Sequence, residues 1–406
     1  AASDVYKRQR LGCGANMMGY YMYVGGTNPI GKRTTYQSSG PRVSYDYQAP
    51  IRESGTLGAV MKETKKYNYF MNDFGTSLAP AIAYLPTSNQ NRENLQWAVR
   101  SDGSTGYLFC SNYLYKNSRK DYKNVRFTVK LKNETVRLPR KKITVKNGTY
   151  FLWPFNQQMN EVRLKYSTTQ PICSLKDGND YTFFFFEDDQ IPGEYLIAEK
   201  NIRNVEVQNG VLVREKDGYF IDRIIPGKEC IIKITKTNGA IVRFVTLTEE
   251  ESDHIWKGAV AGKEFVALTP ASLVCDKNKI VLIENSPQTE IWMFKKGGFK
   301  QQVFRSNPRH LHATYHSVAP MEEGKWICPS GGDKIKREFT VNTFSMIQQA
   351  YLRYASFDSA GCILNGKKIV TKTMGGYEKA DVTAFIQKGD NTCLLYTSPS
   401  PRDSTS

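Results

Sequence analysis

The chain has 406 residues, of which 40% are hydrophobic and 12% aromatic, and this composition excludes a disordered protein. The length exceeds what one hydrophobic core supports, so we expect two or three domains. The 24 Tyr and 20 Phe residues favour strands, because aromatic side chains pack well on a pleated sheet. The composition therefore predicts a multidomain, mostly β protein.

The formal net charge of +17 is high enough to suggest a nucleic-acid-binding protein. In segments such as 130–132 and 137–142, however, basic residues alternate with apolar ones at strand period. One face of a sheet would then carry the charge while the other is buried. We therefore interpret the charge as a solvated face and predict no nucleic-acid partner. No apolar stretch is long enough to cross a bilayer, so we also predict no membrane span.

The two ends of the chain do not continue the patterns beside them. Residues 1–10 (AASDVYKRQR) and 392–406 (TCLLYTSPSPRDSTS) resemble translated sequencing-adapter tails. We expect both segments to be non-native and leave them out of the fold prediction. The native part, 11–391, would then be a gene fragment that is open at both ends.

The first native region has the pattern of a strand, a long loop and a helix. A short apolar run at 19–24 stops at the turn residues 25–29, as expected for a buried strand that enters a loop. Over 57–74 the apolar residues recur every three or four positions, which predicts an amphipathic helix with Gly75 as its cap and Pro80 beyond. Strand, loop and helix form the unit that a (β/α)8 barrel repeats.

From about residue 94 the pattern changes to short alternating runs between turn pairs such as Asn147-Gly148. Two packed antiparallel sheets are the expected product, and we place this β-sandwich at 89–250. A small β domain or connector follows at 251–335. A further sandwich-like domain at 336–391 is cut off at its C-terminal end.

The sequence gives little support for a metal-binding site or for a catalytic nucleophile. The eight cysteines are scattered and contain no C-x-x-C pair. His310, His312 and His316 have no Cys, Asp or Glu close by in the sequence, so we expect no metal site and no cofactor. A catalytic Ser/His/Asp set, a phosphate-binding loop and a dinucleotide fingerprint are also missing.

Two linked motifs carry the functional signal. Residues 21–28 (YMYVGGTN) and 44–53 (SYDYQAPIRE) resemble the end of the catalytic barrel in the β-galactosidases of glycoside hydrolase family 35. In that family the GGTN motif ends the last barrel strand, and the SYDY motif lies in the loop beyond it, over the sugar pocket. The resemblance implies that 11–88 is the end of a catalytic (β/α)8 barrel. Gln48 stands where the family usually carries Asp, and Val24 where many members carry His.

The resemblance also implies which residues form the site. We expect Tyr47 to bind substrate, because its ring face and its hydroxyl group can both contact a galactose ring. The glycines of the first motif would let the backbone approach a ligand closely. The expected scaffold of the pocket comprises Gly25, Gly26, Thr27, Asn28, Tyr45 and Asp46.

The family hydrolyses galactosides by double displacement with two Glu residues, which retaining enzymes hold about 5 Å apart. In family members both lie on earlier barrel strands, so no residue of this chain is assigned as catalytic. We expect Glu53 and Glu63 to be structural or solvated. The acidic segment 187–189 is interpreted as a turn after a buried strand.

A weaker resemblance covers much of the rest of the chain. Residues 95–248 are similar to the β-sandwich domain that follows the barrel, and 357–383 to the jelly-roll domains of these enzymes. The resulting expectation is a fragment of a retaining exo-β-galactosidase, periplasmic or extracellular, that acts on β-galactoside oligo- and polysaccharides. The fragment would be inactive and poorly soluble alone. The alternative is a non-catalytic carbohydrate-binding protein built of β-sandwiches.

Overall fold

The computed structural model describes residues 2–28, 44–276, 278–283, 288–305, 334–341, 351–356, 360–372 and 376–397. The chain forms two compact units. The first comprises Ala1–Tyr23 and Leu57–Arg309, and the second Val24–Thr56 and His310–Ser406. The polypeptide therefore leaves the first unit after Tyr23 and returns to it at Leu57.

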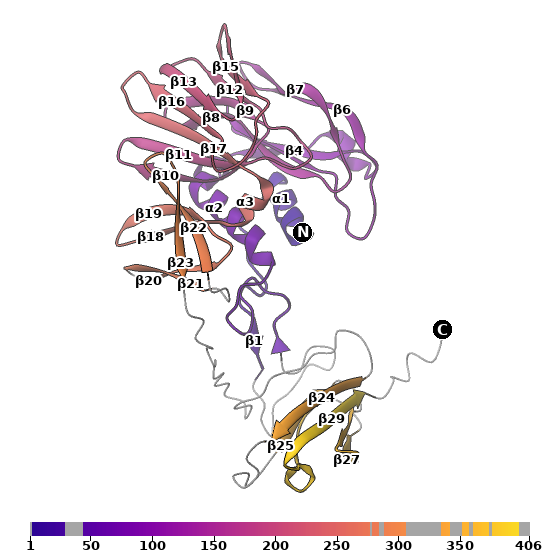
Figure 1. Ribbon diagram of the computed structural model, residues 1–406. Helices are drawn as coiled ribbons and strands as arrows, with labels where there is room; N and C mark the ends of the chain where they lie inside the picture. The colour runs from indigo at the N-terminus through magenta and orange to yellow at the C-terminus, as the bar shows by residue number, and fades with distance from the viewer. Residues whose placement is uncertain are drawn as a thin grey trace. The chain divides into compact units, whose positions relative to one another are not determined.

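The first unit contains two large sheets (Figure 1). The eight-stranded sheet has the order β14 (Val211–Glu215), β15 (Gly218–Asp222), β12 (Tyr195–Ala198), β9 (Val162–Ser167), β8 (Tyr150–Met159), β5 (Gly106–Ser111), β4 (Gln96–Ser101) and β3 (Ile82–Tyr84). The five-stranded sheet has the order β10 (Gln170–Asp177), β11 (Asp180–Phe186), β17 (Ile241–Leu247), β16 (Ile231–Lys236) and β13 (Ile202–Gln208).

Smaller elements cover these sheets. A four-stranded sheet has the order β18 (Ile255–Val260), β19 (Lys263–Leu268), β22 (Gln288–Lys295) and β23 (Gly298–Arg305). Two hairpins are β6 (Tyr122–Lys130) with β7 (Thr135–Val145), and β20 (Ser272–Asp276) with β21 (Lys279–Ile283). The helices are α1 (Ala2–Gly12), α2 (Val60–Leu78), α3 (Glu249–Asp253) and the 3-10 turn η1 (Thr87–Gln90).

The sheets of the first unit stack in layers because each packs its apolar face against a neighbouring element. Side chains of the two large sheets share one core with those of α2. The β6–β7 hairpin packs on the other face of the eight-stranded sheet, and the four-stranded sheet packs on the other face of the five-stranded sheet. Figure 1 shows these two covers on opposite sides of the unit. The central strands of both large sheets are thus buried on both faces, whereas the edge strands β3, β13 and β14 keep exposed residues.

The run of four Phe residues on β11 shows this double burial directly. Phe183 and Phe185 lie in the core between the large sheets, whereas Phe184 and Phe186 face the four-stranded sheet. Neighbouring residues of a strand point to opposite faces, so a strand with two buried faces needs a continuous apolar sequence. All four rings are at most 7% exposed.

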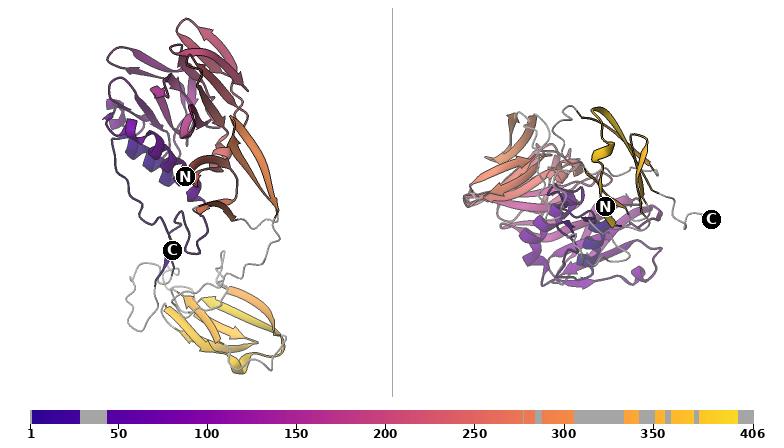
Figure 2. Two further views of the ribbon diagram at one scale, coloured as in Figure 1. Left: turned by 90° about the vertical axis from the view of Figure 1, so that its left-hand side faces the viewer. Right: turned by 90° about the horizontal axis from the view of Figure 1, so that it is seen from below.

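Helix α2 extends further than its predicted cap. It continues through Gly75 to Leu78, which is 1% exposed in the central core. Burial of Leu78 favours the extra turn, and Pro80 then prevents the helix from continuing. Together with α1 it lies against the sheets at one end of the unit (Figures 1 and 2).

Arg100 on β4 joins both helix ends to the sheet. Its side chain is 1% exposed, and no carboxylate pairs with it among the described residues. The guanidinium donates hydrogen bonds to the carbonyl oxygens of Leu78 at 2.9 Å, Ala81 at 2.8 Å and Ala15 at 3.2 Å. Carbonyls at a helix C-terminus lack partners within the helix and carry partial negative charge. Arg100 therefore acts as a cap for the ends of α1 and α2.

Both segments predicted to be non-native tails include residues with regular structure. Residues of the first form most of α1, in which Val5 and Leu11 are buried. Part of the second continues a strand of the second unit to Thr397. The structure does not test whether these segments belong to the natural protein, and their non-native origin stays a prediction.

The described strands of the second unit pair antiparallel. A four-stranded sheet has the order β24 (Lys334–Val341), β29 (Gly389–Thr397), β26 (Ala360–Leu364) and β27 (Lys367–Lys372), while β25 (Tyr351–Ser356) pairs with β28 (Gly376–Asp381). The 3-10 turn η3 (Thr383–Phe385) and the two-stranded ribbon of β1 (Gly26–Thr27) and β2 (Ser44–Tyr45) complete it.

The predicted fold class, mostly β with antiparallel sandwich-like domains, is confirmed. The buried strand predicted at 19–24 is not formed, because the first strand of this region is β1 (Gly26–Thr27) and Tyr21 is 84% exposed. The strands among the described residues of 11–88 pair antiparallel, and a barrel end at this position stays a prediction. None of the helices in the described part of the chain is long and apolar enough to span a membrane.

Candidate functional site

The structure brings the two family-like motifs together. Strands β1 and β2 pair in antiparallel register, with Gly26 opposite Tyr45 and Thr27 opposite Ser44. Asn28 follows β1 and is half-buried. The motifs are separated in the sequence by residues 29–43, yet their backbones form one short ribbon. We refer to residues 24–28 and 44–56 as the motif ribbon.

Two carboxylates hold the motif ribbon in shape. Glu53 accepts hydrogen bonds from the hydroxyl groups of Thr27 and Ser44, one on each carboxylate oxygen. Asp46 accepts a hydrogen bond from the backbone N–H of Glu53 at 2.8 Å and forms an ion pair with Arg52 at 2.8 Å. Both acids are thus engaged by neighbouring groups of the ribbon, and neither is positioned as a free nucleophile.

Gly25 is required by close packing inside the motif ribbon. Its N–H donates to the carbonyl oxygen of Ile51 at 2.7 Å. A Cβ at this position would lie 2.2 Å from Oδ1 of Asp46 and 2.7 Å from the backbone nitrogen of Glu53. The neighbouring Gly26 would meet nothing within 4 Å. A side chain is therefore excluded at Gly25 and has room at Gly26.

Tyr47 is the exposed aromatic residue of the motif ribbon, at 54% of its surface. Tyr47 and Gln48 both have positive φ, 42° and 55°, which turns the chain sharply after β2. The ring of Tyr45 packs edge-to-face against that of Tyr47, with centroids 4.8 Å apart. This contact fixes one edge of Tyr47 and leaves the residue accessible to a ligand.

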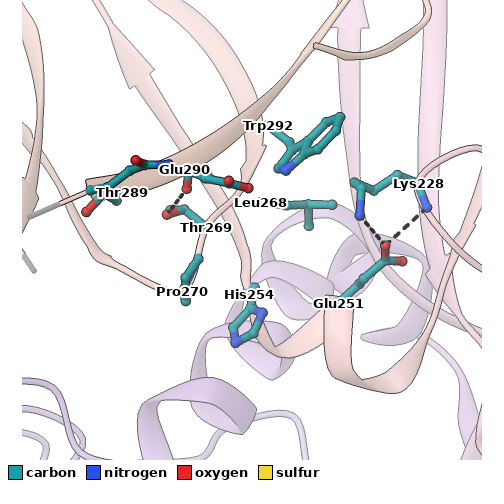
Figure 3. A pocket seen from close by; sticks show the side chains of 10 residues that line it. Lys228, Glu251, His254, Leu268, Thr269, Pro270, Thr289, Glu290 and Trp292 are labelled. Carbon is teal, nitrogen blue, oxygen red and sulfur yellow. Dashed lines mark hydrogen bonds and ion pairs between the residues drawn. The ribbon is translucent and has the colours of Figure 1, made fainter. Parts of the chain in front are cut away.

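A second candidate region lies in the first unit, where a cleft of about 530 Å³ opens beside α3 (Figure 3). Its wall contains the apolar residues Leu268, Pro270 and Trp292. Its polar lining comprises Lys228, Glu251, His254, Thr269, Gln288, Thr289 and Glu290.

Part of this lining is engaged by the protein itself. Nζ of Lys228 pairs with Glu251 at 2.8 Å and lies 4.9 Å from the centroid of the Trp292 ring. Glu251 also completes the capping box of α3 with Thr248. The hydroxyl of Thr269 donates to the carbonyl oxygen of Glu290 at 2.7 Å. These contacts make one side of the cleft rigid.

His254 ends α3 at the edge of the same cleft. Burial lowers the pKa of its imidazole, and the nearby charges of Lys62 and Lys65 lower it further. Both causes disfavour the charged form, so the ring is neutral at pH 7. It then offers one donor and one acceptor nitrogen.

The acidic segment 187–189 forms a turn between β11 and β12. Glu187 accepts a hydrogen bond from the N–H of Gly193 at 2.8 Å, and Asp188 from that of Gln190 at 2.9 Å. Burial raises the pKa of Glu187 to about 7. Its carboxyl group therefore titrates near neutral pH.

The cleft could not be found from sequence motifs. Its residues come from the segment before β16, from α3, and from two strand ends, with no fixed spacing between them. One local signal was readable, because Thr248 and Glu251 have the spacing of a capping box. That signal locates the start of α3 but says nothing about Trp292 or Glu290.

Within the described residues, no three His, Cys, Asp or Glu side chains are grouped so as to hold a metal ion. The three histidines considered as ligands, His310, His312 and His316, lie outside the described residues.

No protein-family model and no curated protein matches this chain. Several solved structures are similar to it, among them two α-L-rhamnosidases. An α-L-rhamnosidase from Dictyoglumus thermophilum is 10% identical with a TM-score of 0.15, covering 52% of this chain and 23% of that chain. An α-L-rhamnosidase from Streptomyces avermitilis, complexed with L-rhamnose, is 10% identical with a TM-score of 0.16, covering 59% of this chain and 36% of that chain. The chain thus spans a minor part of both enzymes, and a likeness at this TM-score decides neither fold nor function.

Proposed function

We propose that the chain is part of a retaining exo-β-galactosidase that removes terminal non-reducing β-D-galactose from oligo- and polysaccharides. The observation that carries the proposal is the pairing of β1 with β2, which joins the two family-like motifs and leaves Tyr47 exposed. An exposed aromatic residue on a rigid support suits a sugar pocket, because it offers an apolar ring face together with a polar hydroxyl group. We further propose that the protein is exported to the periplasm or the extracellular space, where such glycans occur.

In this proposal the chain supplies substrate positioning. The ring of Tyr47 would contact the apolar C–H face of galactose, and its hydroxyl would bind a sugar hydroxyl group. The nucleophile and the general acid/base would be two Glu residues of earlier barrel strands. Glu53 and Asp46 hold the motif ribbon and take no part in bond cleavage.

The experiment is to recover the coding DNA upstream of Leu11, express the extended protein, and measure the hydrolysis of 4-nitrophenyl β-D-galactoside. We expect activity in the extended protein and none in the 406-residue chain. The anomeric configuration of the first-formed galactose, followed by NMR, should be retained. If the extended frame encodes no barrel, or the extended protein leaves the galactoside intact, the proposal is wrong.

A further inference from the structure

The cleft beside α3 combines an apolar wall with polar groups that the protein itself leaves unused. Trp292 lies on β22 opposite Leu268 of β19, and both face the cleft with Pro270. Two residues earlier on β22, Glu290 is exposed. Figure 3 shows its carboxylate extending toward the indole of Trp292.

Three of these groups have bonding capacity left. The carboxylate of Glu290, the indole N–H of Trp292 and the imidazole of His254 make no hydrogen bond or ion pair with another described residue. They come from different elements and border the same space. A ligand in this space would therefore meet an acceptor, a donor and a ring that can do both.

The charges of the cleft argue against an anionic ligand. Lys228 is neutralised by Glu251 at 2.8 Å, and the imidazole of His254 is uncharged at neutral pH. Glu290 then leaves the lining with one net negative charge. A phosphate or carboxylate would find no unpaired cation in the lining, whereas hydroxyl groups can both donate to Glu290 and accept from Trp292.

We propose that this cleft is a binding site for a neutral oligosaccharide. Sugar rings have apolar C–H faces and a rim of hydroxyl groups, and the cleft offers both kinds of surface side by side. Its volume of about 530 Å³ lies within the range of about 300–1,000 Å³ that is typical of small-ligand sites. The engaged contacts of Lys228, Glu251 and Thr269 hold the walls in place before a ligand arrives. The cleft belongs to the first unit and the motif ribbon to the second, and the proposal does not depend on galactosidase activity.

The test is isothermal titration of the full 406-residue chain with three probes: β-1,4-galactotetraose, cellotetraose and xylotetraose. We expect at least one of them to bind. Glu290→Gln should weaken that binding about tenfold, the value of one charged hydrogen bond. Trp292→Phe keeps an aromatic ring in the wall but removes the N–H, and it should also weaken binding severalfold. The melting temperature of each variant reports whether it is folded.

Two variants serve as controls. Glu264→Gln removes the same charge from neighbouring strand β19 outside the cleft, and Tyr47→Ala changes the motif ribbon. Both should bind the tetrasaccharide as the parent chain does. Absence of binding with all three probes would overturn the proposal, as would binding that folded Glu290→Gln and Trp292→Phe leave unchanged. Binding that Tyr47→Ala alone removes would also overturn it, while supporting the proposed galactosidase site.

Discussion

Tyr47 and Tyr84 each expose 54% of their surface, but they lie in different units. In the active extended protein, Tyr47→Ala should lower kcat/KM for a galactoside by about 10- to 100-fold, equivalent to the loss of about 1.4–2.7 kcal/mol of sugar contact. Tyr47→Phe should retain most of the ring contribution. Tyr84→Ala is the matched control and should leave kcat/KM unchanged. Equal losses in the two alanine variants would contradict the assignment of Tyr47.

The raised pKa of Glu187 predicts a pH dependence of the free energy of unfolding. Its sign is opposite to that of an ordinary carboxylate, whose pKa is lowered by folding. The pKa of Glu187 is raised from 4.5 to about 7 in the folded protein. Between these values the native state binds more protons than the unfolded state, so stability falls as pH rises through the window. Glu187→Gln cannot ionise and should be more stable than the parent by about 1–2 kcal/mol at pH 8, discounted for partial exposure.

The measurement for Glu187 is the urea midpoint at pH 5 and at pH 8. His254, whose pKa is lowered, contributes with the opposite sign, but it is present in both proteins and cancels in their difference. A difference between parent and variant that stays constant with pH would contradict the prediction.

At the scale of elements, α2 contains a glycine that lowers the stability of the helix and can be replaced. Gly75 lies inside the helix, and a Cβ there would be 3.5 Å from Met71, an ordinary contact. Gly75→Ala should therefore raise the free energy of unfolding by about 0.5–1 kcal/mol, because alanine loses less backbone entropy on folding. The urea midpoint measures this gain. A lower midpoint would show that the last turn of α2 is not helical in solution.

A buried ion pair attaches α2 to two sheets. Asp73 accepts from Nζ of Lys257 on β18 at 2.8 and 2.9 Å and from the backbone N–H of Ser174 on β10 at 2.6 Å. Asp73→Asn should cost about 3 kcal/mol, since it leaves the lysine charge buried without its main partner. Adding Lys257→Met should recover part of this loss. If the double variant is less stable than Asp73→Asn, the pair is not coupled as described.

Most of the helices and strands could be predicted from the sequence, whereas the tertiary contacts between them could not. The alternation at 95–100 and 106–112 correctly indicated β4 and β5, and the helical spacing at 57–74 indicated α2. Local patterns cannot show that Arg100 caps two helix ends, because its partners lie up to 89 residues away. The cleft was missed for the same reason, since tertiary packing alone joins Trp292 to His254.

At the scale of the whole molecule, the stability of the first unit depends on the elements that cover its two large sheets. The β6–β7 hairpin is held on the eight-stranded sheet by side-chain packing, and Leu138 is fully buried there. Leu138→Ala should cost about 2–5 kcal/mol. Hydrogen exchange should rise first in β6 and β7, while β11 and β17 stay protected. A uniform rise across both large sheets would instead mean that the cover unfolds together with the whole unit.

The parallel pairing of β11 with β17 limits how fast this unit can fold. The two strands are neighbours from Tyr181 and Val242 to Phe186 and Leu247, although about 60 residues separate them in the chain. The strands from β12 to β16 lie in the chain between the two partners, and contacts between residues so far apart in the sequence slow folding. On the ribosome, the four phenylalanines of β11 emerge soon after their neighbour β10 but long before β17, the strand on their other side. We expect this segment to be where a nascent chain most needs a chaperone, and where synthesis at low temperature most improves the yield of folded protein.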